Sequence, residues 1–351
     1  MTGPPSSKIR HILREIDPTG MVISKQGAEV SKANKVISLQ EAVEEFIHDG
    51  AHVTFGGFTM QRHPMAFIRE MIRQRKRELV IYGHSPGIDA DILIGAGAVK
   101  RVEVAYIGDE LFVSPSPNFR KAIEEGSIQW EDYSNFGATL RLVAGALGLP
   151  FIPARTMLGS DMITKSGFGP EERRSDPKAA RQKHVLMDCP FTGDKVVLLP
   201  AVNPDVAVIH AQMVGRDGTV RILGQSYADD FVARAARKVV VTAEEIVSEE
   251  FIRQCPEQNN VPFFRVDAIV HVPYGTHPTA CHGYYDYDPQ HYALYAQAAR
   301  GGAEAFQEYL DTYVYGVQDH WDYLDRIGGT KRLSYLKADP AFGYNPGVRR
   351  R

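Results

Sequence analysis

The chain has 351 residues, of which 44% are hydrophobic and 24% are charged, as in ordinary globular proteins. The formal net charge of −3 and the pI of about 6.5 argue against nucleic-acid or anionic-membrane partners. The three cysteines, Cys189, Cys255 and Cys281, are too few and too widely spaced for a disulfide framework, which favours a reducing cytoplasm. No apolar run reaches the roughly 18 residues that span a bilayer, so we expect a soluble cytoplasmic protein with no membrane partner.

The two ends of the chain differ in composition from its middle. Residues 1–37 are polar, with prolines and serines near the start, and we expect an extension outside the core. The last three residues are arginines, and we expect them to fray at the end of a basic tail over residues 343–351. No linker rich in glycine, proline or serine divides the remainder, so we expect one domain over residues 38–342.

The first part of this domain contains the most informative stretch. A Ser-x-x-Glu capping box predicts a helix over residues 39–48. The apolar run at residues 52–55 predicts a buried strand, which Gly56 and Gly57 end. Pro64 then opens a helix, where its missing N–H costs nothing. Two glycines at the carboxyl end of a strand let the backbone approach a ligand closely, and their N–H groups can point at a thioester carbonyl or a phosphate.

Strand and helix patterns then alternate along the chain. We expect strands at residues 79–82, 99–107, 196–199, 206–210, 219–223, 239–241 and 268–272, and helices at 64–75, 89–95, 227–238 and 289–327. This alternation predicts an α/β fold with an open, mostly parallel sheet flanked by helices. Aromatic residues recur through the last helical region, which predicts a C-terminal helical layer packed on the sheet.

The glycine turn lies in a recognisable string. Asp49-Gly50, the apolar residues 53–55, Gly56-Gly57-Phe58 and Pro64 together resemble the first signature of the family I CoA-transferases. Most of that family has glycine two residues before the proline, whereas this chain has Arg62. A residue other than glycine there resembles the glutaconate CoA-transferase branch, so the departure bears on the substrate and not on the fold.

The resemblance continues through residues 38–342. The His277-Pro278 pair and the Tyr-Asp-Tyr-Asp run at residues 285–288 are similar to the α subunit of the glutaconate branch. The resemblance implies a CoA-transferase fold, coenzyme A as a substrate, no permanently bound cofactor, and a β-subunit partner in an α2β2 or larger assembly. It also implies that the attacking glutamate lies on the β subunit, so that this chain alone is inactive. Within this chain, Glu110 is the nearest candidate for such an attacking glutamate, and we interpret it as a surface carboxylate.

The same resemblance assigns site residues, none of them catalytic and none binding a metal. It implies an oxyanion or CoA-binding role for Gly56, Gly57 and Phe58, and substrate binding by Gln61, Arg62, His84, Ser85 and His277. Arg62 has two open interpretations: it pairs with the distal carboxylate of a dicarboxylic substrate, or it is a surface arginine.

Two other interpretations of the sequence remain. Residues 83–87 form a Gly-x-Ser-x-Gly pattern, and Ser85 with Asp205 and His277 has the chain order of a serine hydrolase triad. Pro86 opposes that hypothesis because it has no N–H for an oxyanion hole. The second alternative keeps the fold and changes the chemistry, to hydrolysis of a ring carbon–carbon bond in a CoA thioester or to decarboxylation of a glutaconyl-type CoA.

A cluster of possible metal ligands also occurs late in the sequence. His271, His277, Cys281 and His282 lie close together, but their spacing matches no familiar ligand pattern. We therefore expect structural or substrate-facing roles for these residues.

Overall fold

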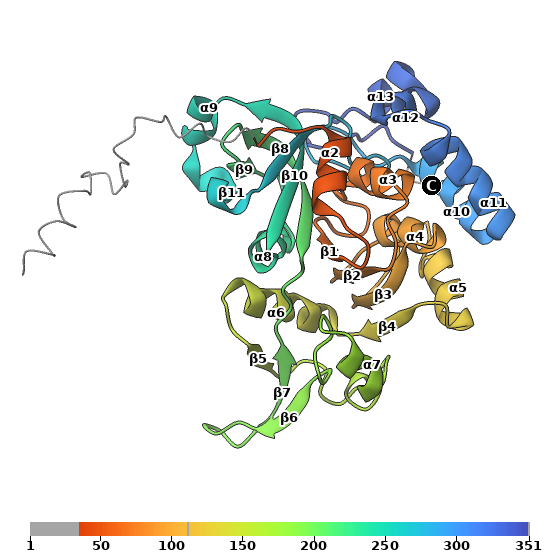
Figure 1. The fold of residues 1–351 in the computed structure, drawn as a ribbon. Helices are drawn as coiled ribbons and strands as arrows, with labels where there is room; N and C mark the ends of the chain where they lie inside the picture. The colour runs from red at the N-terminus through yellow and green to blue at the C-terminus, as the bar shows by residue number, and fades with distance from the viewer. Residues whose placement is uncertain (1–34, 111, 350–351) are drawn as a thin grey trace, which may run out of the picture. The chain divides into compact units, whose positions relative to one another are not determined.

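A central β-sheet organises the chain in the computed structural model, which describes residues 35–110 and 112–349 (Figure 1). Seven strands follow the order β11-β9-β8-β1-β2-β3-β4, and β10 pairs with β8 and β12. All pairs are parallel except those made by β9 and β11. The predicted open, mostly parallel sheet is therefore confirmed.

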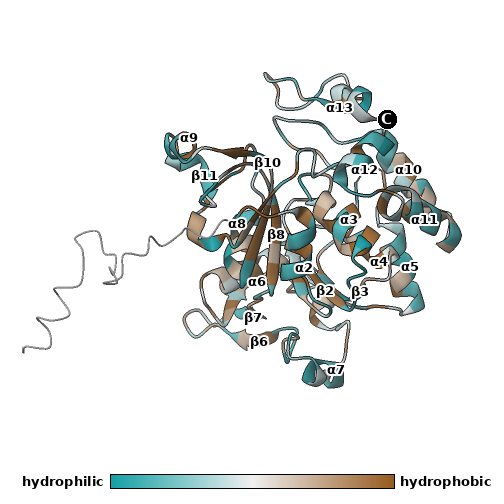
Figure 2. Cartoon of the chain, turned by 45° about the horizontal axis from the view of Figure 1, so that its top comes forward, coloured by the Kyte–Doolittle hydropathy of each residue, from teal (hydrophilic) through white to brown (hydrophobic). Residues whose placement is uncertain are grey.

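The strands of this sheet are short except for two. Their bounds are β1 His52–Phe55, β2 Leu79–Gly83, β3 Val99–Val104, β4 Gln129–Asp132, β8 Val206–Gly215, β9 Val220–Arg221, β10 Lys238–Val247, β11 Asn259–Val261 and β12 Ala268–His271. The long strands β8 and β10 are hydrophobic over most of their length, as Figure 2 shows in brown. Strands buried on both faces need apolar residues at nearly every position.

Helices cover both faces of the sheet. Their bounds are α2 Leu39–Phe46, α3 Met65–Arg73, α4 Ile88–Gly95, α5 Pro117–Glu125, α6 Asn135–Ala146, α7 Pro170–Ser175, α8 Asp229–Ala235, α9 Glu249–Arg253, α10 Pro289–Arg300, α11 Ala303–Leu310, α12 His320–Arg326 and α13 Gly329–Leu336. Successive strand residues enter opposite cores: Val206 and Val208 face α2–α5, α10 and α11, whereas Ala207 and Ile209 face α6 and α8. The helical layer predicted at the C-terminus is present, and its tyrosines are largely buried.

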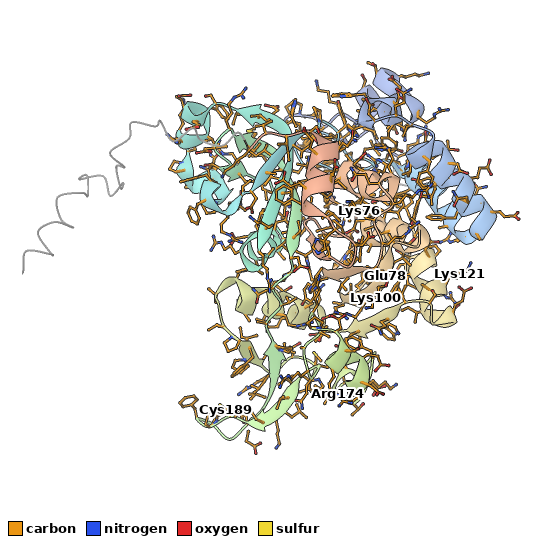
Figure 3. The ribbon with its side chains drawn as sticks, viewed as in Figure 1. Lys76, Glu78, Lys100, Lys121, Arg174 and Cys189 are labelled. Carbon is orange, nitrogen blue, oxygen red and sulfur yellow. The ribbon has the colours of Figure 1, made fainter. Side chains whose placement is uncertain are left out.

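A second, smaller sheet was not expected. It is antiparallel, in the order β5 Phe151–Ala154, β7 Lys195–Pro200 and β6 Val185–Asp188. The strand predicted at residues 196–199 belongs to this small sheet and not to the parallel one. Cys189 lies at the end of its β6–β7 hairpin (Figure 3), and all three cysteines are unpaired.

The predicted domain limits need two corrections where the structure describes them. Residues 35–37 run beside β12, where the Ile37 N–H donates to the Ile269 carbonyl and the Ile269 N–H to the Lys35 carbonyl. The ordered domain therefore includes the last residues of the predicted extension; residues 1–34 lie outside the described part. The predicted basic tail is not separate from the domain over residues 343–349, because Val348 is buried with Leu336. Residues 350–351 also lie outside the described part.

Candidate active site

The Gly-Gly-Phe turn follows β1 in the middle of the parallel sheet, where the carboxyl ends of β1 and β2 lie beside the middle of β8. Gly57 has a φ of +97°, and a Cβ atom there would lie 2.4 Å from the Gln61 carbonyl oxygen. A Cβ on Gly56 would lie 2.7 Å from a carboxylate oxygen of Asp229, at the start of α8. Both positions require glycine because backbone or buried side-chain atoms occupy the space of any larger side chain.

The backbone N–H groups of this turn are already used within the chain. The Gly56 N–H donates to the Val208 carbonyl, and the Phe58 N–H donates to the Gln61 carbonyl, both at 2.9 Å. The Gly57 N–H donates to Oδ1 of Asp229 at 2.9 Å. The expectation that these N–H groups point at a ligand oxygen is therefore not met in the structure.

The structure departs from both interpretations of Arg62 that the sequence left open, a partner of a substrate carboxylate and a surface arginine. Its side chain is buried and forms an ion pair with Asp229. Its guanidinium also donates to the backbone carbonyls of His210 and Gln225, each at 3.0 Å. The surface interpretation is wrong. A free cation for a substrate carboxylate is not present either, because Asp229 already neutralises Arg62.

Asp229 is the residue that the sequence reasoning missed. One oxygen accepts from Gly57 and the other from Arg62, so this carboxylate connects the turn after β1 to the start of α8. An acidic pair opening a helix is so common that Asp229 and Asp230 gave no specific signal. Its partners are 172 and 167 residues away in sequence, and only the sheet brings them together.

His84 and Ser85 follow β2 and lie beside the turn. They line a cavity of about 10 Å³, enough for one water molecule, together with Gly57 and His63. The His84 ring packs against Phe58 with a centroid distance of 5.4 Å, and burial lowers its pKa. Ser85 Oγ accepts a hydrogen bond from Asn135 at 2.6 Å.

The serine hydrolase hypothesis fails on these contacts. Asp205 accepts from Lys178 and from the His52 N–H, and no hydrogen bond joins it to His277 among the described residues. Ser85 has an asparagine as its side-chain partner instead of a histidine. The three residues of the proposed triad therefore belong to three separate networks.

His277 is not in a position to bind substrate. It is 1% exposed, and both of its ring nitrogens have partners: Nδ1 with the Tyr323 hydroxyl at 2.7 Å and Nε2 with Asp288 at 3.0 Å. Asp288 is also paired with Arg332. Burial lowers the pKa of His277 although Asp288 opposes this. The side chain connects its loop to the C-terminal helices, so the structure gives the substrate-binding prediction for His277 no support.

The main pocket opens beside the turn and has a volume of about 590 Å³, within the usual range for ligand sites. Gln61 and Arg62 are the predicted site residues that line it. The other lining residues come from three distant segments: Leu223, Gly224, Gln225, Tyr227, Ala280, His282, Tyr285, Asp286, Gly343 and Tyr344. Phe58 adjoins this pocket by stacking on Tyr227, at a centroid distance of 5.0 Å.

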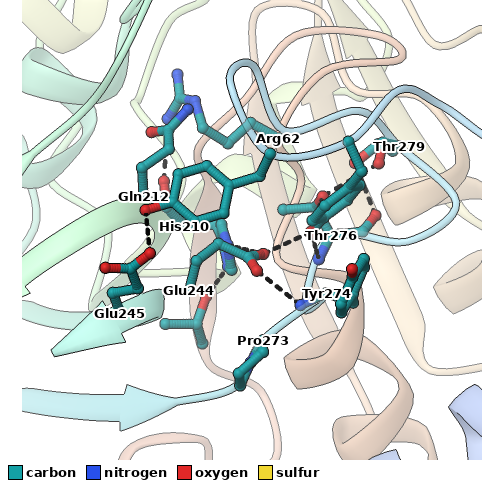
Figure 4. A network of polar contacts seen from close by, with 12 residues as sticks. Arg62, His210, Gln212, Glu244, Glu245, Pro273, Tyr274, Thr276 and Thr279 are labelled. Carbon is teal, nitrogen blue, oxygen red and sulfur yellow. Dashed lines mark hydrogen bonds and ion pairs between the residues drawn. The ribbon is translucent and has the colours of Figure 1, made fainter. Parts of the chain in front are cut away.

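A buried polar network (Figure 4) reaches the pocket through Tyr285, which is one of its lining residues. Glu244 accepts hydrogen bonds from the Tyr285 hydroxyl at 2.5 Å and the Tyr274 N–H at 2.8 Å, and its Oε1 lies 2.9 Å from Nε2 of His210. His210, Glu244 and Cys281 lie close enough to hold a metal ion. Because hydrogen bonds already satisfy Glu244 and both nitrogens of His210, this donor set fits a structural network better than a metal site.

Sequence comparison places these features in a known context. Residues 36–272 match the family model described as Coenzyme A transferase. The chain belongs to the coenzyme A transferase family. Members of this family use CoA as a substrate, and the family resemblance drawn from the Gly-Gly-Phe turn is thereby confirmed.

Individual members of the family are similar to this chain over most of its length. The A-type subunit of glutaconate CoA-transferase from Acidaminococcus fermentans is 40% identical over 313 residues, covering 89% of this chain and 97% of that protein. The A-type subunit of 3-oxoadipate CoA-transferase from Pseudomonas knackmussii is 34% identical over 85% of this chain and 99% of that protein. The cholesterol ring-cleaving hydrolase IpdA subunit of Rhodococcus jostii is 30% identical over 83% and 96%.

Solved structures agree with the family assignment. The crystal structure of glutaconate coenzyme A-transferase from Acidaminococcus fermentans superposes with a TM-score of 0.86, covering 89% of this chain and 98% of that one. The decarboxylase AibA/AibB is 34% identical, with a TM-score of 0.65 over 78% of this chain and 97% of that one. Chains with this fold therefore carry more than one chemistry.

Proposed function

We propose that this chain is the α subunit of a heteromeric CoA-transferase, which moves CoA between an acyl-CoA and a small carboxylic acid, often a dicarboxylic one. The supporting observation is the 40% identity to the A-type subunit of a glutaconate CoA-transferase over almost the full length of both proteins. The pocket beside the Gly-Gly-Phe turn is the proposed place of the acyl group, with Gln61 and Arg62 on its wall.

The acidic groups around this pocket support a nucleophile supplied by a partner. Asp286 is the acidic residue among those lining the pocket, and it is 3% exposed. It accepts hydrogen bonds from the backbone N–H groups of Tyr287 and Asn345, at 2.9 and 3.1 Å. Glu110 is exposed but does not line the pocket. Since the described residues that line the pocket include no other acidic side chain, we expect the attacking carboxylate to come from a β subunit, which would complete an α2β2 or larger cytoplasmic assembly.

In the proposed reaction, the partner's glutamate attacks the thioester carbonyl and releases the CoA thiolate, leaving an acyl anhydride. The thiolate then attacks the glutamyl carbonyl of that anhydride and releases the acyl group as a carboxylate, which gives a glutamyl-CoA thioester. The second acid reverses these steps and leaves as its CoA ester. This chain contributes no bond-forming atom; it holds the acyl group and excludes water.

A second candidate is the same pocket serving carbon–carbon hydrolysis or decarboxylation of a CoA thioester. The similarity to the decarboxylase AibA/AibB and to a subunit of a ring-cleaving hydrolase favours keeping this candidate. Transfer and decarboxylation differ in what they require of the partner, because transfer needs the β-subunit glutamate as a nucleophile and decarboxylation can do without it.

The experiment is to co-express this chain with the protein encoded beside it and to assay exchange of CoA between acetyl-CoA and glutaconate. We expect exchange by the complex, none by this chain alone, and a partner glutamate that hydroxylamine or borohydride traps during turnover. A stable complex that binds CoA esters without exchange or trapping would contradict the transferase and favour the second candidate.

A further inference from the structure

His282 lies on the wall of the main pocket and is held there in an unusual way. Its ring sits between two glycines, one of which lies earlier in the sequence than His282 and the other later. A Cβ atom on Gly224 would lie 2.9 Å from Cδ2 of the ring, and one on Gly343 would lie 2.2 Å from Cε1. Both glycines have positive φ values, +78° and +73°. Only glycine at both positions leaves room for an imidazole between the two backbones.

The C-terminal segment forms one side of this clamp. The Gly283 N–H donates to the Gly343 carbonyl at 2.7 Å, and the Asn345 N–H donates to Asp286 at 3.1 Å. The His282 carbonyl accepts from the Gln212 amide at 3.0 Å, which fixes the backbone from the β8 side. The histidine is nevertheless exposed. The fold therefore fixes the position of the imidazole and leaves the residue open to the pocket.

The chemistry of the surrounding wall indicates what this imidazole meets. Gln61, Gln225 and Tyr227 add hydrogen-bonding side chains, and Leu223 and Ala280 add apolar surface. The charge of Arg62 is neutralised by Asp229, and the Asp286 carboxylate is occupied by backbone N–H groups. Among the side chains that line the pocket, the His282 imidazole therefore offers an N–H donor for an anionic group at the end of a short carbon chain.

We propose that His282, clamped by Gly224 and Gly343, is the specificity-determining residue that binds the distal carboxylate of a dicarboxylic acid in this pocket. The inference rests on the proposed function, since the other carboxylate of that acid has to reach the nucleophile of the partner. It gives His282 the role that the sequence left open for Arg62.

The test compares two acids that differ by one carboxylate, glutaconate and crotonate, as CoA acceptors for the complex with the β subunit. In His282→Ala, we expect kcat/KM for glutaconate to fall at least tenfold more than kcat/KM for crotonate, mainly through KM. In Gly343→Ala, the displaced ring should change the same ratio in the same direction. A ratio within twofold of the wild type in both variants would overturn the proposal.

Gly193→Ala is the matched control for backbone strain. Gly193 has a φ of +75°, close to that of Gly343, but nothing lies within 4 Å of its Cβ position. The Gly193→Ala variant should keep the wild-type ratio of kcat/KM for glutaconate to kcat/KM for crotonate. A shift of this ratio equal to that of Gly343→Ala would overturn the clamp.

A binding measurement separates the failure of this inference from the failure of the proposed function. If the wild-type complex exchanges no CoA, calorimetric titration with glutaconate still measures the site. Binding that His282→Ala weakens at least tenfold supports the inference whatever the reaction is. Equal binding by both proteins, or no binding by the wild type, overturns it.

Discussion

The Gly56–Arg62 turn and the Thr276–Asp288 tract border the same pocket, yet they differ in how far their sequence predicts their structure. In the turn, steric limits on the backbone dominate, and the glycines stand where the sequence places a tight approach. In the tract, His277 and His282 are five residues apart; one is buried with both nitrogens bonded, and the other is exposed on the pocket wall. Backbone constraints can be predicted locally, whereas the fate of a side chain depends on distant partners.

Among the groups that hold the turn, the Asp229 carboxylate should contribute most to the free energy of unfolding, although the sequence did not single it out. Asp229→Ala leaves the buried Arg62 without its counter-charge, and loss of one partner of a buried pair costs about 3–5 kcal/mol. Urea unfolding of the chain measures this difference in the free energy of unfolding.

The control for this prediction is an ion pair in solvent. Arg120 and Glu124 pair on α5 with side chains 66% and 63% exposed, so Glu124→Ala should cost about 1 kcal/mol at most. Similar losses of unfolding free energy in the two variants would show that burial does not increase the contribution of the Arg62–Asp229 pair to stability.

The steric account of the turn predicts the next largest effect. Gly57→Ala adds a Cβ atom 2.4 Å from the Gln61 carbonyl oxygen at a positive φ, and we expect about 3 kcal/mol of destabilisation or more. Gly126→Ala isolates the contribution of φ, because Gly126 has a φ of +66° and nothing lies within 4 Å of its Cβ position. Thermal unfolding should show the smaller loss for Gly126→Ala; equal losses would mean that the contact with Gln61 costs nothing.

Substitution of the two histidines of the tract should have different effects on the free energy of unfolding. His277→Ala leaves the buried Tyr323 hydroxyl and one Asp288 oxygen without this partner, which costs about 1–3 kcal/mol. His282→Ala removes an exposed side chain and should change the free energy of unfolding by about 0.5 kcal/mol or less. Chemical denaturation of both variants checks the contrast, and a His282→Ala loss as large as that of His277→Ala would refute it.

The buried histidines also predict how stability changes with pH. Burial lowers the pKa of His52 to about 4 and that of His320 to about 3. Below about pH 6.5 the unfolded chain binds protons at these residues while the folded chain does not, so the free energy of unfolding falls as pH falls toward 4.

Removal of one buried histidine should flatten this dependence. His52→Gln should reduce the slope between pH 6 and pH 5 by about 1.4 kcal/mol per pH unit at most, since one fewer proton is taken up on unfolding. The exposed His48 provides the matched control, and His48→Gln should leave the slope close to that of the wild type. An unchanged slope in His52→Gln would contradict a neutral, buried His52.

Much of the fold followed from the sequence, for reasons visible in particular elements. The capping box predicted the start of α2, and it forms with Ser38 and Glu41. β1 lies at the predicted residues, because an apolar run that ends at two glycines has few alternatives. The small sheet was missed because exposed strands such as β6 lack the alternating pattern on which strand prediction depends.

No helix in the described residues has both the length and the apolar character required to cross a membrane. This agrees with the absence of a long apolar run in the sequence. Within the described residues, the pocket beside the Gly-Gly-Phe turn is the place from which function is best argued.

The sequence by itself determined the parallel sheet and the place of the glycine turn, because these depend on periodicity and on steric limits within short segments, and its Gly-Gly-Phe string carried the resemblance to the family. The tertiary structure alone decided which charged and polar groups are free. Asp229 occupies both the Gly57 N–H and Arg62 from the start of α8, Asp288 and Tyr323 occupy His277, and two glycines 119 residues apart (343 − 224) hold His282 at the pocket. Folding fixes these pairings because a buried polar group requires a partner, wherever in the chain that partner lies.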